Sequence, residues 1–162
     1  MMKRTLLMLL SLVLLCSPVT SGSQAGSDSY VDEAYHVELH YPKEWKKVSA
    51  AIDPNEFRGP DGYFKISATS GPSLRSEVNS LVYYKLRPYG TRPTIKYLLI
   101  QKQRACLILP SRDQSDEDEG AALFVTYPRA VEINGEKYGY FVLFADKRHI
   151  QEIAQSVRFF YR

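Results

Sequence analysis

The sequence predicts a domain of the α+β class, and three features support this prediction. Residues 34–41 alternate between apolar and polar side chains, which is the period of a strand with one buried face. Asn134-Gly135 separates two apolar runs, and this dipeptide is the strongest short-range signal for a hairpin of antiparallel strands. Residues 74–85 and 147–156 carry apolar side chains at helical spacing. We therefore expect hairpin-paired strands interrupted by two helices.

Composition and charge are those of one globular domain. The 162 residues are 44% hydrophobic and 24% charged, unlike disordered or fibrous chains. The formal net charge is +3. If Lys3 and Arg4 are removed during maturation, 21 basic residues become 19 against 18 acidic ones, which leaves a net charge of +1. This balance predicts no general attraction to nucleic acid or to anionic membranes.

The N-terminal residues have the pattern of a secretory signal peptide. Residues 1–4 end in Lys-Arg, and residues 5–16 are apolar but too few to span a bilayer as a helix. Small residues permit cleavage after Ser21 or as late as Ala25. The expected parts of this exported protein are a signal peptide at 1–21, a flexible tether at 22–33 and a single domain at 34–162.

Cys16 leaves a second interpretation of the N-terminus open. A cysteine directly after the apolar stretch is where bacterial lipoproteins are cleaved and acylated, but Leu15 stands where that signal normally has a small residue. Removal of Cys16 with the signal peptide is therefore favoured, and lipid anchoring is the alternative. Without Cys16, Cys106 is the only thiol, so no internal disulfide is expected.

In the first half of the domain, turn residues separate the expected elements. Residues 34–41 turn an aromatic and aliphatic face inward, and Trp45 folds back after Pro42 as a core anchor. Clusters of Gly, Pro and Asp bracket the next two strands, and a Ser- and Pro-rich stretch is typical of a helix start. The expected elements are strands at 34–41, 56–58 and 63–69, then a helix from Leu74 that ends before Pro88.

The second half is expected to be rich in strands. Cys106 lies in a run that is apolar on both sides, which predicts a central, well-covered strand. Acidic residues make 110–120 a polar loop, Pro128 divides one apolar run into two strands, and Asp146 can cap a helix. The expected elements are strands at 94–102, 104–109, 121–127, 130–133 and 138–145, a helix at 147–156, and a terminal strand or extended tail at 157–161.

This order, together with two short motifs, resembles the superfamily of PsbP-like and Mog1-like domains. Tyr41-Pro42-Lys43-Glu44-Trp45 is similar to the aromatic-proline-x-x-tryptophan step out of their first strand. Ser156-Val157-Arg158-Phe159 is similar to the Val-x-Phe-like end that follows their last helix. The resemblance spans roughly residues 30–162. It implies an antiparallel sheet with helices on both faces, an α/β/α sandwich.

The resemblance also implies a role in scaffolding or partner binding, in a small exported or lipid-anchored bacterial protein. No catalytic residue defines the superfamily. The chain lacks the acidic and histidine constellation that a metal role of the photosystem members would require. Nothing in an exported protein suggests a Ran-type GTPase partner.

His36 and His40 are candidate metal ligands that the expected strand keeps apart. On a strand they point the same way but stand about 13 Å apart, at roughly 3.3 Å per residue. A shared zinc ion needs ligands about 2 Å from the metal. We therefore expect two exposed histidines on the polar face and no metal site.

Cys106, His149 and Asp146 supply the residue types of a thiol hydrolase, in which a histidine activates the cysteine and a carboxylate orients the histidine. Asp146, however, stands where a helix cap is needed. Cys106 lies among Leu and Ile in a strand, and free cysteine is usually a buried apolar residue. Structural roles are therefore favoured for both.

The acidic loop resembles part of a calcium-binding loop. Asp116, Asp118 and Gly120 have the spacing of its first half, but the third acidic ligand is missing and Tyr127 stands where a bidentate glutamate belongs. A solvated loop is the favoured interpretation, and weak cation binding is the alternative.

Three polar residues form the candidate partner or ligand surface, namely Arg129, Arg148 and His149. Several tyrosines at positions outside the expected core could extend this surface. They are Tyr83, Tyr84, Tyr127, Tyr138 and Tyr140.

No catalytic residue, metal or cofactor is assigned, because the chain has no Gly-x-Ser-x-Gly, phosphate-binding glycine loop or Cys-x-x-Cys motif. The leading hypothesis is an exported, monomeric, non-enzymatic domain of the cell envelope that binds a protein or cell-wall partner. One alternative is a small hydrolase or small-ligand carrier with a groove near His149. The other is a lipid-anchored sensor or accessory lipoprotein, which would contact the membrane only through Cys16.

Overall fold

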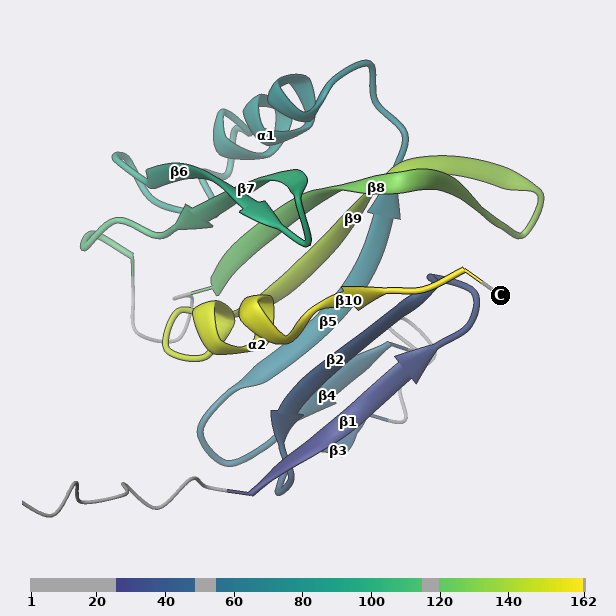
Figure 1. Cartoon of the computed structure of the whole chain (residues 1–162). Coiled ribbons are helices and arrows are strands. Elements are labelled where there is room, and N and C mark those ends of the chain that lie inside the picture. Colours follow the sequence, from purple (N-terminus) through teal and green to yellow (C-terminus); the bar gives the residue numbers. More distant parts are fainter. Residues whose placement is uncertain (1–25, 49–54, 115–119, 162) are drawn as a thin grey trace, which may run out of the picture.

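The computed structural model describes residues 26–48, 55–114 and 120–161 (Figure 1). The predicted signal peptide with Cys16, residues 53–54 and residues 115–119 of the predicted polar loop lie outside these ranges. The strands are β1 (Ser27–Asp32), β2 (Val37–Pro42), β3 (Lys46–Lys47), β4 (Glu56–Arg58), β5 (Tyr63–Thr69), β6 (Thr94–Ile100), β7 (Gln103–Leu109), β8 (Gly120–Ile133), β9 (Glu136–Asp146) and β10 (Arg158–Phe159). The helices are α1 (Leu74–Val82) and α2 (Ile150–Ser156).

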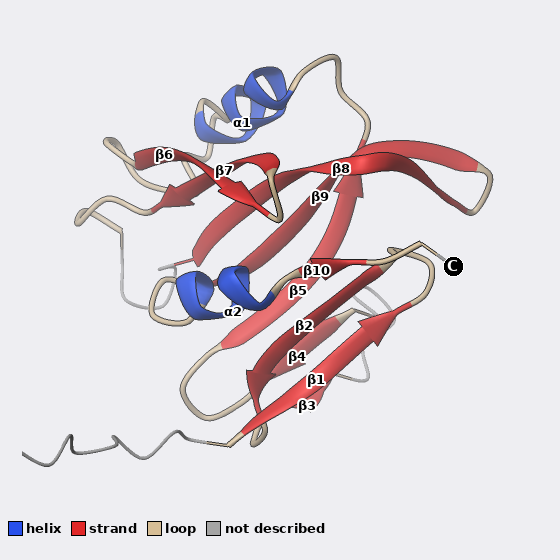
Figure 2. Ribbon diagram, viewed as in Figure 1, coloured by secondary structure: helices blue, strands red, loops and turns tan. Residues whose placement is uncertain are grey.

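The strands form two sheets in which every described pair is antiparallel. The large sheet has the order β3-β4-β5-β9-β8-β7-β6, and the small sheet has the order β1-β2-β10. Figure 2 shows that α1 lies apart from the small sheet. The chain that leaves α2 continues into β10, which pairs with β2 of the small sheet. The α+β class predicted from the sequence is confirmed. Neither helix in the described ranges is long and apolar enough to cross a bilayer.

The two faces of the large sheet are covered differently. On one face, α1 packs on β7 and β8. On the other face, the small sheet and α2 share one core with the inward side chains of β5, β8 and β9. The α/β/α sandwich that the resemblance implied is therefore not confirmed, because a second sheet and one seven-residue helix cover the face opposite α1.

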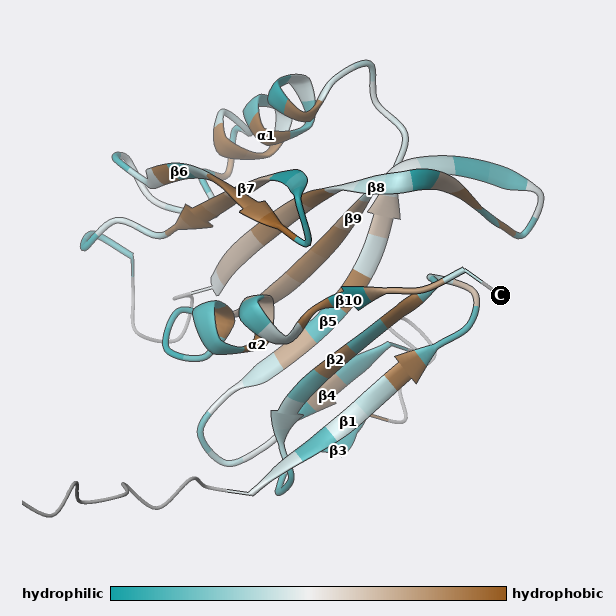
Figure 3. Ribbon diagram, viewed as in Figure 1, coloured by the Kyte–Doolittle hydropathy of each residue, from teal (hydrophilic) through white to brown (hydrophobic). Residues whose placement is uncertain are grey.

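The alternation of strand side chains explains the two cores. Leu123 pairs with Leu143, and both are fully buried in the core on the α2 side. The next pair, Phe124 and Val142, points to the opposite face and packs beneath Val78 of α1. Because both faces of β8 and β9 are covered, these strands are apolar along much of their length (Figure 3).

Trp45 is the core anchor that the sequence predicted. Its side chain is only 1% exposed, and its ring stacks at 6.3 Å from that of Phe64 on β5. The backbone N–H of Trp45 donates to the carbonyl of Pro42, which closes the turn that brings the indole back. Pro42 therefore ends β2 and directs the largest apolar side chain of the chain into the core.

The predicted tether is wrong for its second half, because Ser27–Asp32 forms β1 and pairs with β2. Tyr30 gives the physical reason. Its ring lies 5.0 Å from Phe57 and 5.9 Å from Phe64, so this one side chain packs against the core, while its neighbours in β1 are polar or exposed. A strand with so little apolar surface has the composition of a linker.

Two turns also differ from the prediction. Residues 121–127 and 130–133 belong to one strand, β8, and Pro128 lies at a register shift between Thr126 and Val131. A bulge tolerates proline because its residues need not donate to the ladder. The predicted strand at 94–102 ends earlier, because Gln101 and Lys102 both adopt positive φ and form a two-residue hairpin turn.

We expect Gly59→Ala to destabilise the fold through Trp45. A Cβ atom on Gly59 would lie 2.0 Å from Cδ1 of Trp45, so the indole would have to shift. The expected loss is about 1–3 kcal/mol in the free energy of unfolding, measured by denaturant titration of the fluorescence of this only tryptophan. Gly139→Ala is the control, since no atom lies within 4 Å of its Cβ position. Equal stability of the two variants would contradict the close packing at Trp45.

Candidate functional site

Arg148 and His149 lie in the turn that leads into α2, and Asp146 organises this turn. The Asp146 carboxylate accepts hydrogen bonds from the backbone N–H groups of Arg148 at 3.0 Å, His149 at 3.2 Å and Tyr63 at 3.2 Å. It also contacts Nδ1 of the His149 ring at 2.8 Å. The helix begins at Ile150 and not at residue 147, because residues 147–149 form the turn held by Asp146.

The His149 ring is enclosed by groups that hold it in place. Its Nε2 lies 3.4 Å from Oδ2 of Asp61, and the ring meets the Trp45 indole edge to face at 4.9 Å. The Trp45 indole N–H donates to Oδ1 of Asp61 at 2.9 Å, and the Arg148 guanidinium donates to the backbone oxygen of Asp61. The pKa of the Asp61 carboxyl is lowered, first by the Trp45 hydrogen bond and then by the His149 and Arg148 charges.

The side chains of Asp61, Asp146 and His149 bring acid and base groups together, but the thiol of Cys106 is not among them. Cys106 is fully buried in the core beneath α1, whereas Trp45 and Ile150, next to His149, belong to the core on the other face of the sheet. Burial raises the pKa of Cys106 to about 11, so the thiol is neutral at ordinary pH. The sheet therefore separates Cys106 from His149 and Asp146, the other two residues of the hypothetical thiol hydrolase.

Arg129 lies in another part of the molecule. Its guanidinium stacks at 4.6 Å over the ring of Tyr161, whose hydroxyl accepts from the Arg129 backbone N–H and donates to its carbonyl. Tyr161 follows β10, whereas His149 precedes α2, and Figure 1 shows the C-terminus beyond the far end of α2 and β10. The predicted surface of Arg129, Arg148 and His149 is therefore not one continuous site.

The predicted tyrosines do not gather around His149 either. Tyr127 is buried, and its hydroxyl donates to the Tyr35 carbonyl. Tyr138 donates to Glu136 next to the hairpin turn. Tyr83 and Tyr84 are exposed in the connection after α1. The groove expected near His149 is thus not built from these side chains.

His36 and His40 have separate environments. His36 lies in the turn before β2 with φ of 49°, and its ring stacks on Tyr161 at 5.4 Å. His40 is exposed on β2, with Nε2 4.0 Å from Glu38. Within the described ranges, no three His, Cys, Asp or Glu side chains are placed to hold a metal ion. Asp116 and Asp118 of the suggested calcium loop lie outside these ranges.

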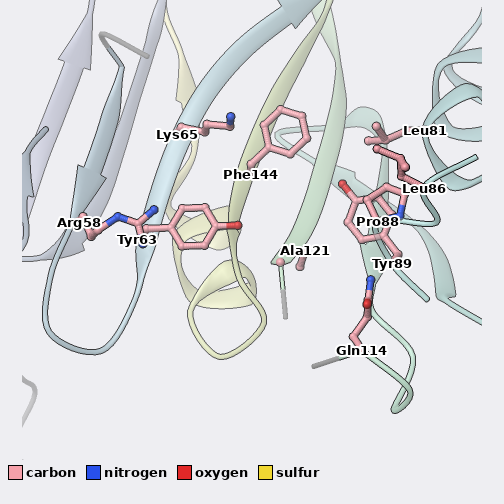
Figure 4. A pocket seen from close by; sticks show the side chains of 11 residues that line it. Arg58, Tyr63, Lys65, Leu81, Leu86, Pro88, Tyr89, Gln114, Ala121 and Phe144 are labelled. Carbon is pink, nitrogen blue, oxygen red and sulfur yellow. The ribbon is translucent and has the colours of Figure 1, made fainter. Parts of the chain in front are cut away.

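A hollow of about 560 Å³ lies between β5, β9 and the connection after α1 (Figure 4). One wall carries Arg58 and Lys65, and the opposite wall is largely apolar and includes Leu81 and Leu86. The Arg58 guanidinium is paired with Glu56 at 2.6 Å, and the Lys65 ammonium lies 5.5 Å from the centre of a phenyl ring. His149 is not among the residues that line this hollow, so a small ligand bound here would lie away from His149.

The outermost strand of the large sheet carries an exposed apolar surface that the sequence analysis missed. Tyr97 and Leu99 on β6 are 62% and 67% exposed. They border a hollow of about 420 Å³ between β6 and the start of α1. We call this surface the β6 edge site, and the residues that line its hollow are Ser73, Leu74, Arg75, Tyr97, Leu98, Leu99, Arg104 and Ala105. The alternation of Ile95, Tyr97 and Leu99 was visible in the sequence, but the position of β6 at the edge was not.

We expect Asp146→Ala to destabilise the protein by about 2–3 kcal/mol, because three backbone N–H groups and the His149 ring lose their acceptor. Glu132→Ala, at an exposed position of β8, is the control and should change the free energy of unfolding by at most about 0.5 kcal/mol. Denaturant titration measures both. An Asp146→Ala variant as stable as the control would show that the turn does not depend on this carboxylate.

Cys106 should be unreactive in the folded protein. In a Cys16→Ser variant it is the only thiol. Because Cys106 is fully buried and its pKa is raised to about 11, a water-soluble disulfide reagent at about pH 8 should modify it only after unfolding. The release of the coloured thiolate, with and without denaturant, measures this. Rapid modification of the folded protein would contradict the buried position.

Comparison with known proteins adds evidence on the fold. No family model and no curated protein matches the chain. The chain is similar to the solution structure of cyanobacterial PsbP (CyanoP) from Synechocystis sp. PCC 6803, with a TM-score of 0.50 and 16% sequence identity. The match covers 90% of this chain and 99% of that chain. At this identity the likeness concerns the fold alone: the chain has a PsbP-like fold, which confirms this part of the resemblance seen in the sequence.

Proposed function

We propose that the protein is an exported, non-enzymatic accessory domain that binds a partner protein through the β6 edge site. The exposed apolar surface of Tyr97 and Leu99 on the outermost strand is the observation that carries this proposal. Proteins usually shield a long apolar edge strand, because its unpaired backbone groups invite association. In the described residues no further strand covers the outer side of β6, and exposed apolar side chains with a hollow beside them are typical of an interaction site.

The proposal moves the partner surface away from Arg129, Arg148 and His149. Asp61, Asp146 and Trp45 already engage the His149 ring, and Tyr161 engages Arg129. These contacts stabilise the turn before α2 and the C-terminal segment. Within the β6 edge site, Tyr97 and Leu99 are not buried in either core, since both project from the body of the protein.

Binding is favoured over catalysis because the polar side chains near His149 are occupied by contacts within the protein. Acid and base groups come together at Asp61, His149 and Asp146, but these groups bind one another and backbone N–H groups. A catalytic site would also need a nucleophile or a water pocket beside them. Cys106, the nucleophile of the hypothetical thiol hydrolase, lies on the opposite face of the sheet.

The export part of the proposal depends on the N-terminal sequence. The basic residues Lys3 and Arg4 and the apolar stretch that follows have the pattern of a secretory signal. We place the partner in the cell envelope or outside the cell for this reason. Attachment to the membrane would require acylation at Cys16, which remains the alternative.

Site-specific photo-crosslinking tests the proposed surface. A photoreactive benzoylphenylalanine replaces Tyr97 in the full chain, expressed in the cells that produce the protein, and Lys137 on the exposed β8–β9 hairpin is replaced as the control. We expect one discrete cross-linked species from position 97 and none from position 137, detected by mass on a denaturing gel. The same product from both positions, or none from position 97, would contradict binding at the β6 edge site.

A further inference from the structure

We infer that the β6 edge site takes up an extended, acidic segment of its partner as an added strand of the large sheet. This inference rests on the proposed function and names the chemistry of the partner. It combines three independent features of β6: backbone groups that point outward, an apolar hollow beside the strand, and a surplus of positive charge around it.

The pairing register shows which backbone groups of β6 point outward. Ile100 and Gln103 flank the two-residue turn, so they form a hydrogen-bonded pair. Hydrogen-bonded and non-hydrogen-bonded pairs alternate along an antiparallel ladder. The N–H and C=O groups of Ile95, Tyr97 and Leu99 therefore point away from β7. In the described ranges nothing pairs with this side of β6, so these groups can bind a further strand.

The hollow gives an added strand a place for its side chains. Tyr97 pairs with Cys106 and Leu99 pairs with Arg104, so both side chains lie on the face that α1 covers. The helix packs on β7 and β8 and leaves Tyr97 and Leu99 exposed. Apolar side chains of an incoming strand can enter the space of about 420 Å³ between these two residues and the first turn of α1.

Charge identifies the incoming strand as acidic. Four basic side chains lie on or beside the site: Arg75 on α1 and Arg104 on β7 line the hollow, Lys102 lies in the turn after β6, and Lys96 lies on the opposite face of β6. Each is exposed, and no carboxylate in the described part of the chain forms an ion pair with any of them. A second copy paired along β6 would bring the same four cations against these, so self-association is disfavoured. An extended segment with carboxylates satisfies both the backbone and the charges.

The probe for the test is a synthetic peptide with the alternating sequence Glu-Val-Glu-Phe-Glu-Val-Glu, and the same peptide with Lys in place of Glu is its control. The full chain is labelled with ¹⁵N, and amide hydrogen exchange is followed with and without peptide. We expect the amides of Ile95, Tyr97 and Leu99 to become protected by at least tenfold when the acidic peptide is present. The amides of Lys96, Leu98 and Ile100 already bond to β7 and should change little.

Two matched pairs of variants separate backbone pairing from charge. Tyr97→Pro removes an outward N–H without breaking the β6–β7 ladder, so it should weaken peptide binding at least tenfold relative to Tyr97→Val, which keeps the N–H. Arg104→Glu should weaken binding severalfold, whereas Lys137→Glu on the distant hairpin should not. Fluorescence anisotropy of labelled peptide measures the dissociation constants. Each variant is first compared with the wild type by circular dichroism, so that loss of the fold is recognised.

Several results would overturn the inference. One is equal binding of the lysine peptide and the acidic peptide. Another is protection of other amides but not of those of Ile95, Tyr97 and Leu99. A third is protection that rises with protein concentration in the absence of peptide, which would indicate pairing with a second copy of this chain. Absence of peptide binding together with a cross-link from position 97 would reject the acidic strand and leave the proposed function standing. Absence of that cross-link would instead remove the proposed function.

Discussion

The packing of Trp45 is the interaction on which the arrangement of the chain depends most. The indole lies between the ring of Phe64 on β5 and the ring of His149 before α2, and its N–H is bound by Asp61. It therefore connects the segment that leaves the small sheet, the hairpin between β4 and β5, and the start of the last helix. The close approach of Gly59 to the indole shows how little free space this contact leaves.

One consequence is that polar residues near Trp45 act as structural residues. Asp146 ends β9, and its carboxylate binds the backbone of the following turn and of Tyr63 on the neighbouring strand. His149 is fixed by Asp146 on one ring nitrogen and lies near Asp61 on the other. An aspartate and a histidine three residues apart have the composition of a catalytic pair, yet here they stabilise the approach to α2.

The sequence predicted well those parts of the fold in which local pattern and burial agree. The alternation of apolar and polar side chains predicts the strand at Tyr63–Thr69, and a Ser cap predicts the helix start at Leu74. The size of the Trp45 side chain predicts its burial. It failed for Ser27–Asp32, because an edge strand with one half-buried aromatic has a polar composition. It also could not reveal that Cys106 and His149 lie on opposite faces of the sheet, since that depends on strand order, which periodicity does not contain.

Strand order also gives β6 its importance. The same residues, Ile95 to Ile100, would be unremarkable in the middle of the sheet, where apolar side chains on both faces are covered. At the edge, a strand of seven residues without proline requires some other protection against pairing with copies of itself. Lys96, Lys102 and Arg104 supply it, because like charges repel when two such edges approach. Such protection is selective, because like charges oppose pairing with a second copy of this chain, whereas they would attract the acidic strand that we propose as the partner segment.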